Sequence, residues 1–497
     1  MPPSSSKPDG PAGEGERHRA GGRGPAGEGG GLFDAVLCRG AVHDATTAVA
    51  WLQAMLDAEA ALARASAAAG LMDADAAEAI AAVCRAEHFD VAAIGQAAAA
   101  TGSPVVPLVR ALTDAVDGPA AAHVHRGATS QDILDTAAML IAARALRPLT
   151  DDLRAAADAA ADLARRYRDT PATGRTLLQH AVPVTFGFKA AVWLSGLDDA
   201  VSRLEAVRRD RLAVQLGGAA GTLESLGAEG LDVVGHLARE LDLAEPVVAW
   251  HTVRIRLVEL ASALGAAAGV CAKIARDVTL LAQTEVGEVR EDAGGRGGSS
   301  TMPHKHNPVA AIATIAAATR APGLVATLLG AMTHEHERAA GSWHAEWLPF
   351  TDLLRATGSA AAWLRDCLTH LRVDTARVRA NLDLTAGAAQ AERVVTALAD
   401  VLGRLAAHEL VTRASDRATA EARPLADVLS EDPKVTAHLD GADVHRLLDP
   451  AEATGSAARL VDRALAHYAT LQHTPTSEGP KMRASTGEPA GGDLGSR

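Results

Sequence analysis

A string of chemically useful residues occupies positions 294–309, which read GGRGGSSTMPHKHNPV. Its glycine-rich start predicts a mobile loop that can order over a ligand, and Ser299 and Ser300 stand at the end of that start. Lys305 and Asn307 follow and supply an ammonium and an amide, which suit a carboxylate and the negative charge that develops on it. The string therefore predicts a catalytic lid over a site for an anionic substrate.

Long helices must position this loop. Of the 497 residues 48% are hydrophobic and only 3% aromatic, and Leu, Val and Ile recur every three or four positions in alanine-rich stretches. This pattern predicts an all-α fold, with helices at 130–167, 184–212, 250–288, 308–332 and 389–413 among others. Helices of this length with broad apolar faces need partners, so we expect a homo-oligomer.

Charge and cysteine content exclude several classes of function. The net charge of −13 offers no basic surface for nucleic acid, and the four cysteines have no CxxC spacing, which indicates packing thiols in a reducing compartment. The low-complexity ends, 1–31 and 474–497, are predicted to be disordered tails without a secretion signal. No apolar stretch reads as a membrane span, so we expect a cytoplasmic protein.

Cofactor and metal motifs are not recognisable. The loop lacks the spacing of a phosphate-binding loop, and no glycine-rich turn follows an expected strand. Three histidine pairs at i, i+2 spacing, His123/His125, His304/His306 and His334/His336, would point to different faces of a helix. We therefore expect neither a cofactor nor a metal.

The segment GSSTMPHKHNP within the loop resembles the signature loop of the fumarase/aspartase superfamily, and the resemblance extends over about residues 32–470. It implies that Ser299, deprotonated on closure, is the base that removes a proton next to a substrate carboxylate. Ser300 would help to bind the resulting enediolate, and Lys305 and Asn307 would hold a carboxylate. Such a serine needs positive charge or N–H donors nearby, because its hydroxyl is otherwise a poor base.

Two further segments resemble substrate-binding regions of the superfamily. HRGATSQD at 125–132 implies that Thr129 and Ser130 bind a substrate carboxylate, although the same residues alone would read as a helix N-cap. Ser103, within Gly102-Ser103-Pro104, matches another substrate-contacting loop, and a simple turn or capping role remains open for it.

Residues 174–188, GRTLLQHAVPVTFGF, resemble a third region but depart from it at one position. After Thr176 the chain has Leu177 where fumarases and adenylosuccinate lyases typically have a histidine. A carboxylate or nitrite leaves as an anion without a general acid, whereas an amine or hydroxide does not. The pattern is therefore similar to the cycloisomerase branch, with Gln179 and His180 as pocket residues; a purely structural His180 remains open.

The string HEHERAAGSWHAEW at 334–347 also resembles the cycloisomerase form. It implies that Arg338 pairs with a substrate carboxylate, and that Trp343 and His344 shape the pocket.

The resemblance implies a homotetramer with a twenty-helix core, in which three subunits build each site. Each chain would have an N-terminal helical domain (32–125), a central bundle (126–364) and a C-terminal helical domain (365–473). The implied activity is the interconversion of 3-carboxy-cis,cis-muconate, a tricarboxylate, and a carboxymuconolactone, in protocatechuate breakdown. Two alternatives stay open: a lyase that releases nitrite or an amine from a substituted succinate to give fumarate, and a catalytically silent structural or binding protein.

Overall fold

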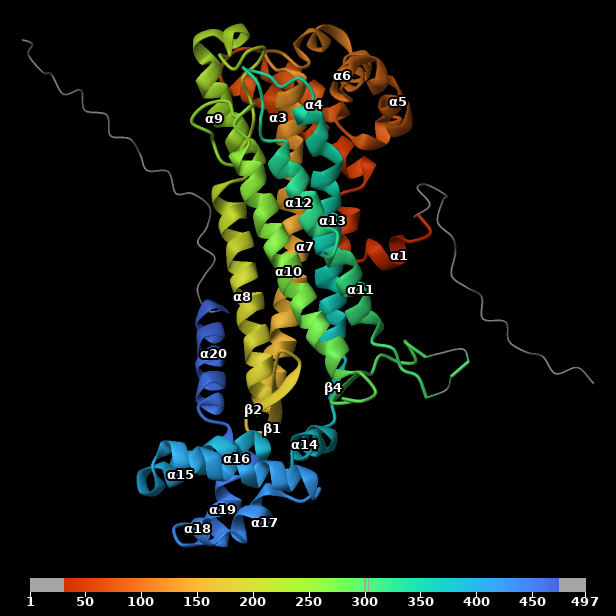
Figure 1. Cartoon of the computed structure of the whole chain (residues 1–497). Coiled ribbons are helices and arrows are strands. Elements are labelled where there is room, and N and C mark those ends of the chain that lie inside the picture. Colours follow the sequence, from red (N-terminus) through yellow and green to blue (C-terminus); the bar gives the residue numbers. More distant parts are fainter. Residues whose placement is uncertain (1–30, 299–300, 303, 473–497) are drawn as a thin grey trace, which may run out of the picture.

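The computed structural model describes residues 31–298, 301, 302 and 304–472, and it is mostly helical, as expected. An elongated bundle carries one group of short helices at each end (Figure 1). Apart from Gly31, the predicted tails at 1–31 and 474–497 lie outside the described residues.

The bundle is built from long helices that pack through alanine and leucine. Small side chains at 0% exposure, such as Ala145, Ala267 and Ala361, let the helices approach closely. Its members are α7 (Ser130–Arg166), α8 (Phe186–Asp210), α10 (Ile255–Leu281), α11 (Val309–Ala318), α12 (Ala321–Gly330) and α13 (Ser342–Thr369).

Helix α7 sets the length of the molecule. Thr129 is its N-cap, and the Asp132 carboxylate accepts from the Thr129 N–H at 2.9 Å in a capping box, which fixes where the helix begins. With 37 residues, α7 spans about 55 Å.

Two helices expected to be continuous are each divided in two. Pro322 lies in the first turn of α12, where it has no N–H to continue the preceding helix, so 308–332 becomes α11 and α12. Gly403 takes φ +80°, a conformation that ends α15 (Ala391–Leu402) before α16 (Arg404–Ala420) begins.

Most of the remaining helices form the two ends. One end holds α3 (Ala48–Ala68), α4 (Ala74–Val83), α5 (Val91–Thr101), α6 (Val105–Ala115) and α9 (Gly230–Leu241), with 3-10 turns Ala86–His88, Gly118–His123 and Glu224–Glu229. The other holds α14 (Thr375–Asp383), α15, α16, α17 (Leu425–Ser430), α18 (Pro433–Thr436) and α19 (Gly441–Leu447), with 3-10 turns Ala388–Gln390 and Pro450–Ala453. A separate apolar core around Leu398 and Leu429 holds this second group together, and α20 (Ala457–Gln472) returns to pack on α8. The short helices α1 (Asp34–Leu37) and α2 (Ala41–Asp44) lie along the side of the bundle, where both contact α13.

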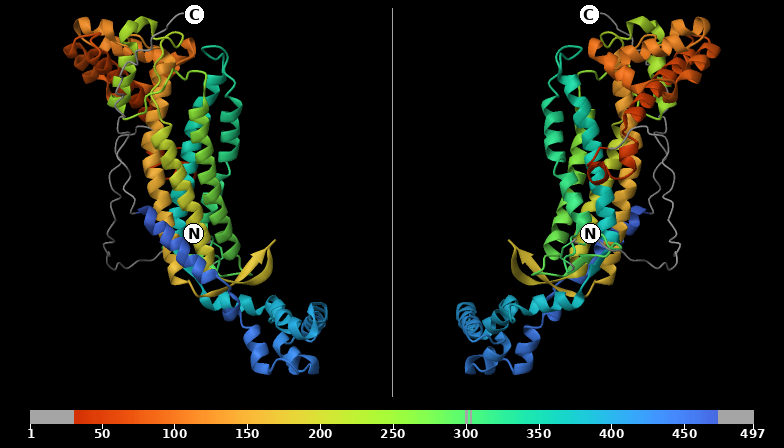
Figure 2. Two further views of the ribbon diagram at one scale, coloured as in Figure 1. Left: turned by 90° about the vertical axis from the view of Figure 1, so that its left-hand side faces the viewer. Right: turned by 90° about the vertical axis from the view of Figure 1, so that its right-hand side faces the viewer.

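Two small antiparallel sheets correct the expectation of a purely α-helical chain. Strands β1 (Pro171–Thr176) and β2 (Gln179–Thr185) form a hairpin, and β3 (Val289–Glu291) pairs with β4 (Leu371–Val373). The hairpin stands out from the bundle (Figure 2, yellow). Its strands were missed because neither is a clear run of alternating β-branched residues.

Part of the bundle surface is apolar. By length and composition alone, α10 and the segment Val309–Gly330 could cross a membrane, but 56% of the apolar window in α10 is buried within the chain's own bundle. Only 39% of the window in Val309–Gly330 is buried, so this segment presents an apolar face that the single chain leaves uncovered.

Candidate active site

The predicted site residues fall into two groups at opposite ends of the bundle. The first, called the head cluster here, surrounds the start of α7. Its members are Thr129, Ser130, Gln131, Asp132, Asp135, Gly217, Gly218, His251, Arg254, His334, Arg338, Trp343 and Glu346, which the hydrogen bonds below connect.

Thr129 and Ser130 are half-buried at the first turn of α7. The positive end of the helix dipole makes this a favourable place for a carboxylate. The predicted N-cap role and the predicted carboxylate-binding position therefore coincide in space.

Arg338 lies directly beside this turn. Its Nη1 donates to Gln131 Oε1 at 3.0 Å, and its Nη2 donates to the carbonyls of Gly218 and Ala219, both at 3.0 Å. The Nε–H and one Nη1–H have no acceptor among the described residues. The segment with Arg338 and the segment with Thr129 and Ser130 therefore lie side by side. A shared role in binding substrate carboxylates requires such proximity.

Beneath them lies a buried ion cluster that the sequence did not reveal. Arg254 binds Asp135 through two bonds of 2.8 and 3.0 Å and binds Glu346 at 2.6 Å, and all three side chains are at most 4% exposed. Burial raises the pKa of Glu346 to about 7, although Arg254 acts to lower it. Burial acts to raise the pKa of Asp135 as well, but its bonds to Arg254 outweigh burial and lower it.

A ring nitrogen of Trp343 and one of His334 complete the buried ion cluster. Trp343 Nε1 donates to Asp135 at 3.1 Å, so the predicted pocket-shaping tryptophan braces the ion cluster instead of standing free. His334 Nε2 lies 3.2 Å from Glu346, and burial, followed by the charge of Arg254, lowers the pKa of His334. One shared proton on Glu346 or His334 would balance the second carboxylate.

Ser103 lies next to this end of the molecule. Its Oγ accepts from the Val105 N–H at 3.3 Å, which is the turn role left open above, and its side chain is buried. His344 Nε2 donates to the Gly102 carbonyl at 3.0 Å, so the loop with Ser103 and the string with Arg338 are in contact.

The second group lies at the other end, on the β1–β2 hairpin. Thr176 and Gln179 face each other across a two-residue turn, and both are exposed. The turn residues Leu177 and Leu178 take φ +51° and +65° and are 97% and 73% exposed. Leucine rarely adopts the left-handed conformation, so the turn is strained, and both apolar side chains are exposed. These two features indicate that another surface covers this tip.

A partly buried ion pair holds the hairpin close to its turn. Arg175 binds Glu288 through two bonds of 2.5 and 3.1 Å, and Asn381 also donates to Glu288 at 2.8 Å. Neighbouring His180 is half-buried, and burial followed by the charge of Arg175 lowers its pKa. A neutral imidazole is favoured there, which suits either a pocket residue or a structural one.

The lid begins beside the same end, after β3. Ser299 and Ser300, the predicted base and its neighbour, lie outside the described residues. Lys305 is exposed, and its ammonium has no partner in the described part of the chain. Asn307 Nδ2 donates to the Gly297 carbonyl at 3.1 Å, and its backbone N–H donates to the same oxygen at 2.9 Å. In this state Asn307 closes the loop on itself.

One chain cannot assemble all of these residues. The head cluster is at the start of α7, whereas the hairpin and lid are at its far end, about 55 Å away by the rise of the helix. The predicted site residues of one chain therefore lie in two separate groups, which are called half-sites here.

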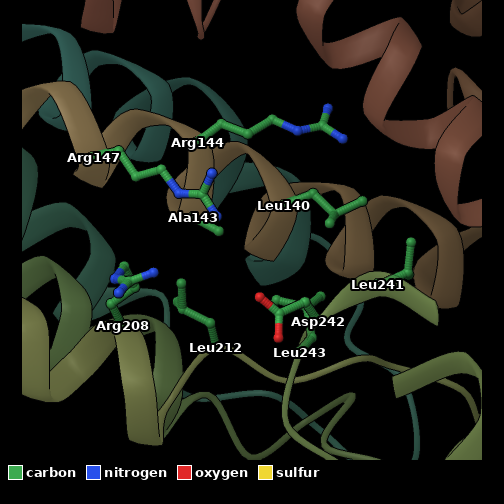
Figure 3. A pocket seen from close by; sticks show the side chains of 9 residues that line it. All are labelled: Leu140, Ala143, Arg144, Arg147, Arg208, Leu212, Leu241, Asp242 and Leu243. Carbon is green, nitrogen blue, oxygen red and sulfur yellow. The ribbon is translucent and has the colours of Figure 1, made fainter. Parts of the chain in front are cut away.

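A hollow enclosed by the single chain is separate from both half-sites. It has a volume of about 190 Å³ and lies among α7, the end of α8 and the end of α9 (Figure 3). Three guanidinium groups and four leucines line it, together with Asp242, but no predicted site residue does. Among the described residues no group of three His, Cys, Asp or Glu side chains is placed to hold a metal ion.

Sequence reasoning missed His251, Arg254, Asp135 and the Arg175–Glu288 pair. The one local signal was Asp132, which the string Thr-Ser-Gln-Asp marks as a first-turn acceptor. Its partner His251 is 119 residues away in the chain, and Arg254 is equally far from Asp135, so only the packed structure reveals these contacts.

Comparisons with known proteins show the family to which the chain belongs. The lyase family matches residues 38–323, and the adenylosuccinate lyase C-terminus family matches 387–464. A 3-carboxy-cis,cis-muconate cycloisomerase of Pseudomonas aeruginosa is 49% identical over 448 residues, 89% of this chain and 98% of that protein. Nitrosuccinate lyase of Streptomyces davaonensis is 46% identical over 447 residues, 88% of this chain and 94% of that protein. The crystal structure of 3-carboxy-cis,cis-muconate lactonizing enzyme from Pseudomonas putida superposes with a TM-score of 0.84 at 44% identity, covering 89% of this chain and 99% of that one.

Proposed function

Because this chain belongs to the lyase family of the fumarase/aspartase superfamily, we propose that it is a cycloisomerase that interconverts 3-carboxy-cis,cis-muconate and a carboxymuconolactone. The observation that carries the proposal is its likeness, at 48 and 49% identity over almost the full chain, to two cycloisomerases of that name. The exposed Leu177 agrees with it, because ring closure needs no general acid for a leaving group.

The proposed reaction is an intramolecular addition. One substrate carboxylate oxygen bonds to a carbon of the far double bond, and the electron pair of that bond moves into the carboxylate conjugated with it, which gives an enediolate. A proton then bonds to the carbon next to that carboxylate. Three carboxylates become a lactone and two carboxylates, so one proton is taken up overall.

The residues divide this work between the half-sites. Thr129, Ser130 and Arg338 would hold carboxylates at the positive start of α7, where N–H donors already converge. Ser299 would exchange the proton at carbon, with Ser300, Lys305 and Asn307 around the enediolate and Thr176, Gln179 and His180 on the opposing wall. Ser103 would support the first group through the contact of its loop with His344.

We propose a cytoplasmic homotetramer with a twenty-helix core, in which each site combines regions of three subunits. The separated half-sites, the uncovered face of Val309–Gly330 and the bare leucines of the hairpin tip support this assembly. The division at 32–125, 126–364 and 365–473 remains part of the proposal.

A second candidate is nitrite elimination from nitrosuccinate, which the 46% identical Streptomyces davaonensis lyase favours. Nitrite also leaves without a proton, so Leu177 permits both reactions.

The test is an ultraviolet assay of the purified protein with 3-carboxy-cis,cis-muconate, beside S299A and the control S415A on α16. Loss of diene absorbance with the parent and S415A, but not with S299A, is the expected result. No turnover by an assembled parent would overturn the cycloisomerase, and release of fumarate from nitrosuccinate would establish the second candidate.

A further inference from the structure

Asp132 is a buried carboxylate at the head cluster that receives an unusual number of hydrogen bonds. Its Oδ1 accepts from the Gly217 N–H at 3.0 Å and lies 2.6 Å from His251 Nε2. Its Oδ2 accepts from the N–H groups of Thr129 and Gly218, each at 2.9 Å. A capping box needs only the bond from the Thr129 N–H, so capping α7 leaves the other three of the four contacts unexplained.

The extra bonds close a glycine turn onto α7. Gly218 has φ +68°, and a Cβ there would lie 2.9 Å from the Gly127 carbonyl oxygen; a Cβ on Gly217 would lie 2.8 Å from His251 Cε1. Only a turn without side chains reaches the carboxylate in this way. His251 is 3% exposed and packs against the turn while it contacts Asp132.

The closed turn supports Arg338. The carbonyls of Gly218 and Ala219 accept from Arg338 Nη2, and Gln131, which accepts from Nη1, is itself held by bonds to Asp135 and to the His251 carbonyl. Every contact that orients the Arg338 guanidinium therefore runs through the turn that Asp132 closes or through its sequence neighbour.

We propose that Asp132 and His251 are positioning residues for carboxylate recognition. They hold the turn 217–219 so that Arg338 presents its remaining N–H groups toward a carboxylate of a di- or tricarboxylate substrate at the start of α7. This role rests on the proposed function. It gives a role to the buried pair of Asp132 and His251, which takes no part in the proposed reaction.

The variants D132N, H251L and H251Q test the proposal, with D152N as control. Asp152 is a buried carboxylate on the same helix that pairs with Arg365, away from the head cluster. D132N and H251L should lower kcat/KM by about 100-fold, mainly through KM, because a misplaced guanidinium weakens binding. H251Q keeps an N–H donor and should stay within about tenfold of the parent, and D152N within about threefold.

A double-mutant cycle with R338A separates positioning from a general loss of structure. If Asp132 acts through Arg338, D132N should cost no more than about twofold in the R338A background. Full, additive losses in that background would overturn the proposal, as would a KM for H251L equal to that of the parent.

Two readouts keep this test distinct from failure of the proposed function. Calorimetry with tricarballylate, a tricarboxylate that cannot react, should show weaker binding to D132N than to D152N. If the parent neither binds this probe nor turns over any substrate, the proposed function fails. Amide exchange then decides the positioning: faster exchange at Gly217 and Gly218 in D132N than in D152N supports it, and equal exchange contradicts it.

Discussion

The side chains that define the head cluster are bound mainly to one another, so its chemistry depends on a few buried charges. Arg254 is shared by Asp135 and Glu346, and this buried ion cluster lies directly under the residues expected to bind a carboxylate. A change to one buried charge should therefore alter both the free energy of unfolding and its dependence on pH.

Removing the guanidinium should be costly. In R254M, Asp135 and Glu346 would remain buried without their cation, and the expected loss is about 3–5 kcal/mol in the free energy of unfolding. Urea unfolding measures it. The control R256M removes an arginine that donates to the Arg211 carbonyl and should lose about 1 kcal/mol. Equal losses in the two variants would contradict the shared ion cluster.

Glu346 should make stability depend on pH. Its folded pKa of about 7 lies above the unfolded value, so the folded chain retains a proton that the unfolded chain releases as pH rises from about 4.5 to 7. Stability therefore falls over this window by up to about 3 kcal/mol relative to E346Q, which has no proton to lose. Unfolding of both proteins at pH 5 and pH 7.5 checks this; a constant difference would contradict it.

At the scale of residues, distinctive local strings predicted candidate site residues, whereas the packing partners of those residues could not be predicted from the sequence. Thr129, Ser130 and Arg338, each in such a string, lie close together at the start of α7. The buried residues His251 and Arg254 precede α10, more than 100 positions away from Asp132 and Asp135, and no local pattern links them to these partners.

Among the elements, the long helices followed from alanine-rich periodicity, whereas the hairpin did not. A two-residue turn with positive φ at both positions normally contains Asn or Gly, and Leu177–Leu178 gives no such signal. The glycine-rich loop, unlike the hairpin turn, could be recognised in the sequence. The different roles of its individual glycines, however, are seen only in the structure.

Gly297 and Gly295 separate those roles. Both take left-handed φ, +86° and +85°, but a Cβ on Gly297 would lie 2.3 Å from the Asn307 carbonyl oxygen, whereas a Cβ on Gly295 meets nothing within 4 Å. G297A should therefore open the clasp between Gly297 and Asn307 and lower kcat by about 100-fold, and G295A by no more than about fivefold. Steady-state kinetics and the melting temperature of both variants measure this. Equal kcat values would show that backbone strain alone matters.

For the whole molecule, the length of α7 is the decisive quantity. It separates the head cluster from the hairpin and the predicted lid by about 55 Å, so the proposed site, which uses both regions, requires more than one chain. The sequence resemblance implied this assembly. The single chain supports it through its separated half-sites, the exposed apolar face of Val309–Gly330 and the exposed leucines of the hairpin turn.

Mixing two inactive variants tests the shared site. R338A damages the head cluster and S299A damages the lid, and in a hybrid tetramer some sites receive both regions intact from different chains. Refolding the two together should restore about a quarter of the parent's activity, as random assembly requires. R338A mixed with D132N damages one region in both chains and should restore nothing. Activity that stays absent in the first mixture would place the whole site within one chain.

The most direct measurement follows the reaction by NMR in D2O with 3-carboxy-cis,cis-muconate. We expect the parent, but not S299A, to produce a lactone that carries one deuterium on the carbon next to the carboxylate that formed the enediolate. An unchanged substrate with the assembled parent, or a lactone without deuterium at that carbon, would contradict it.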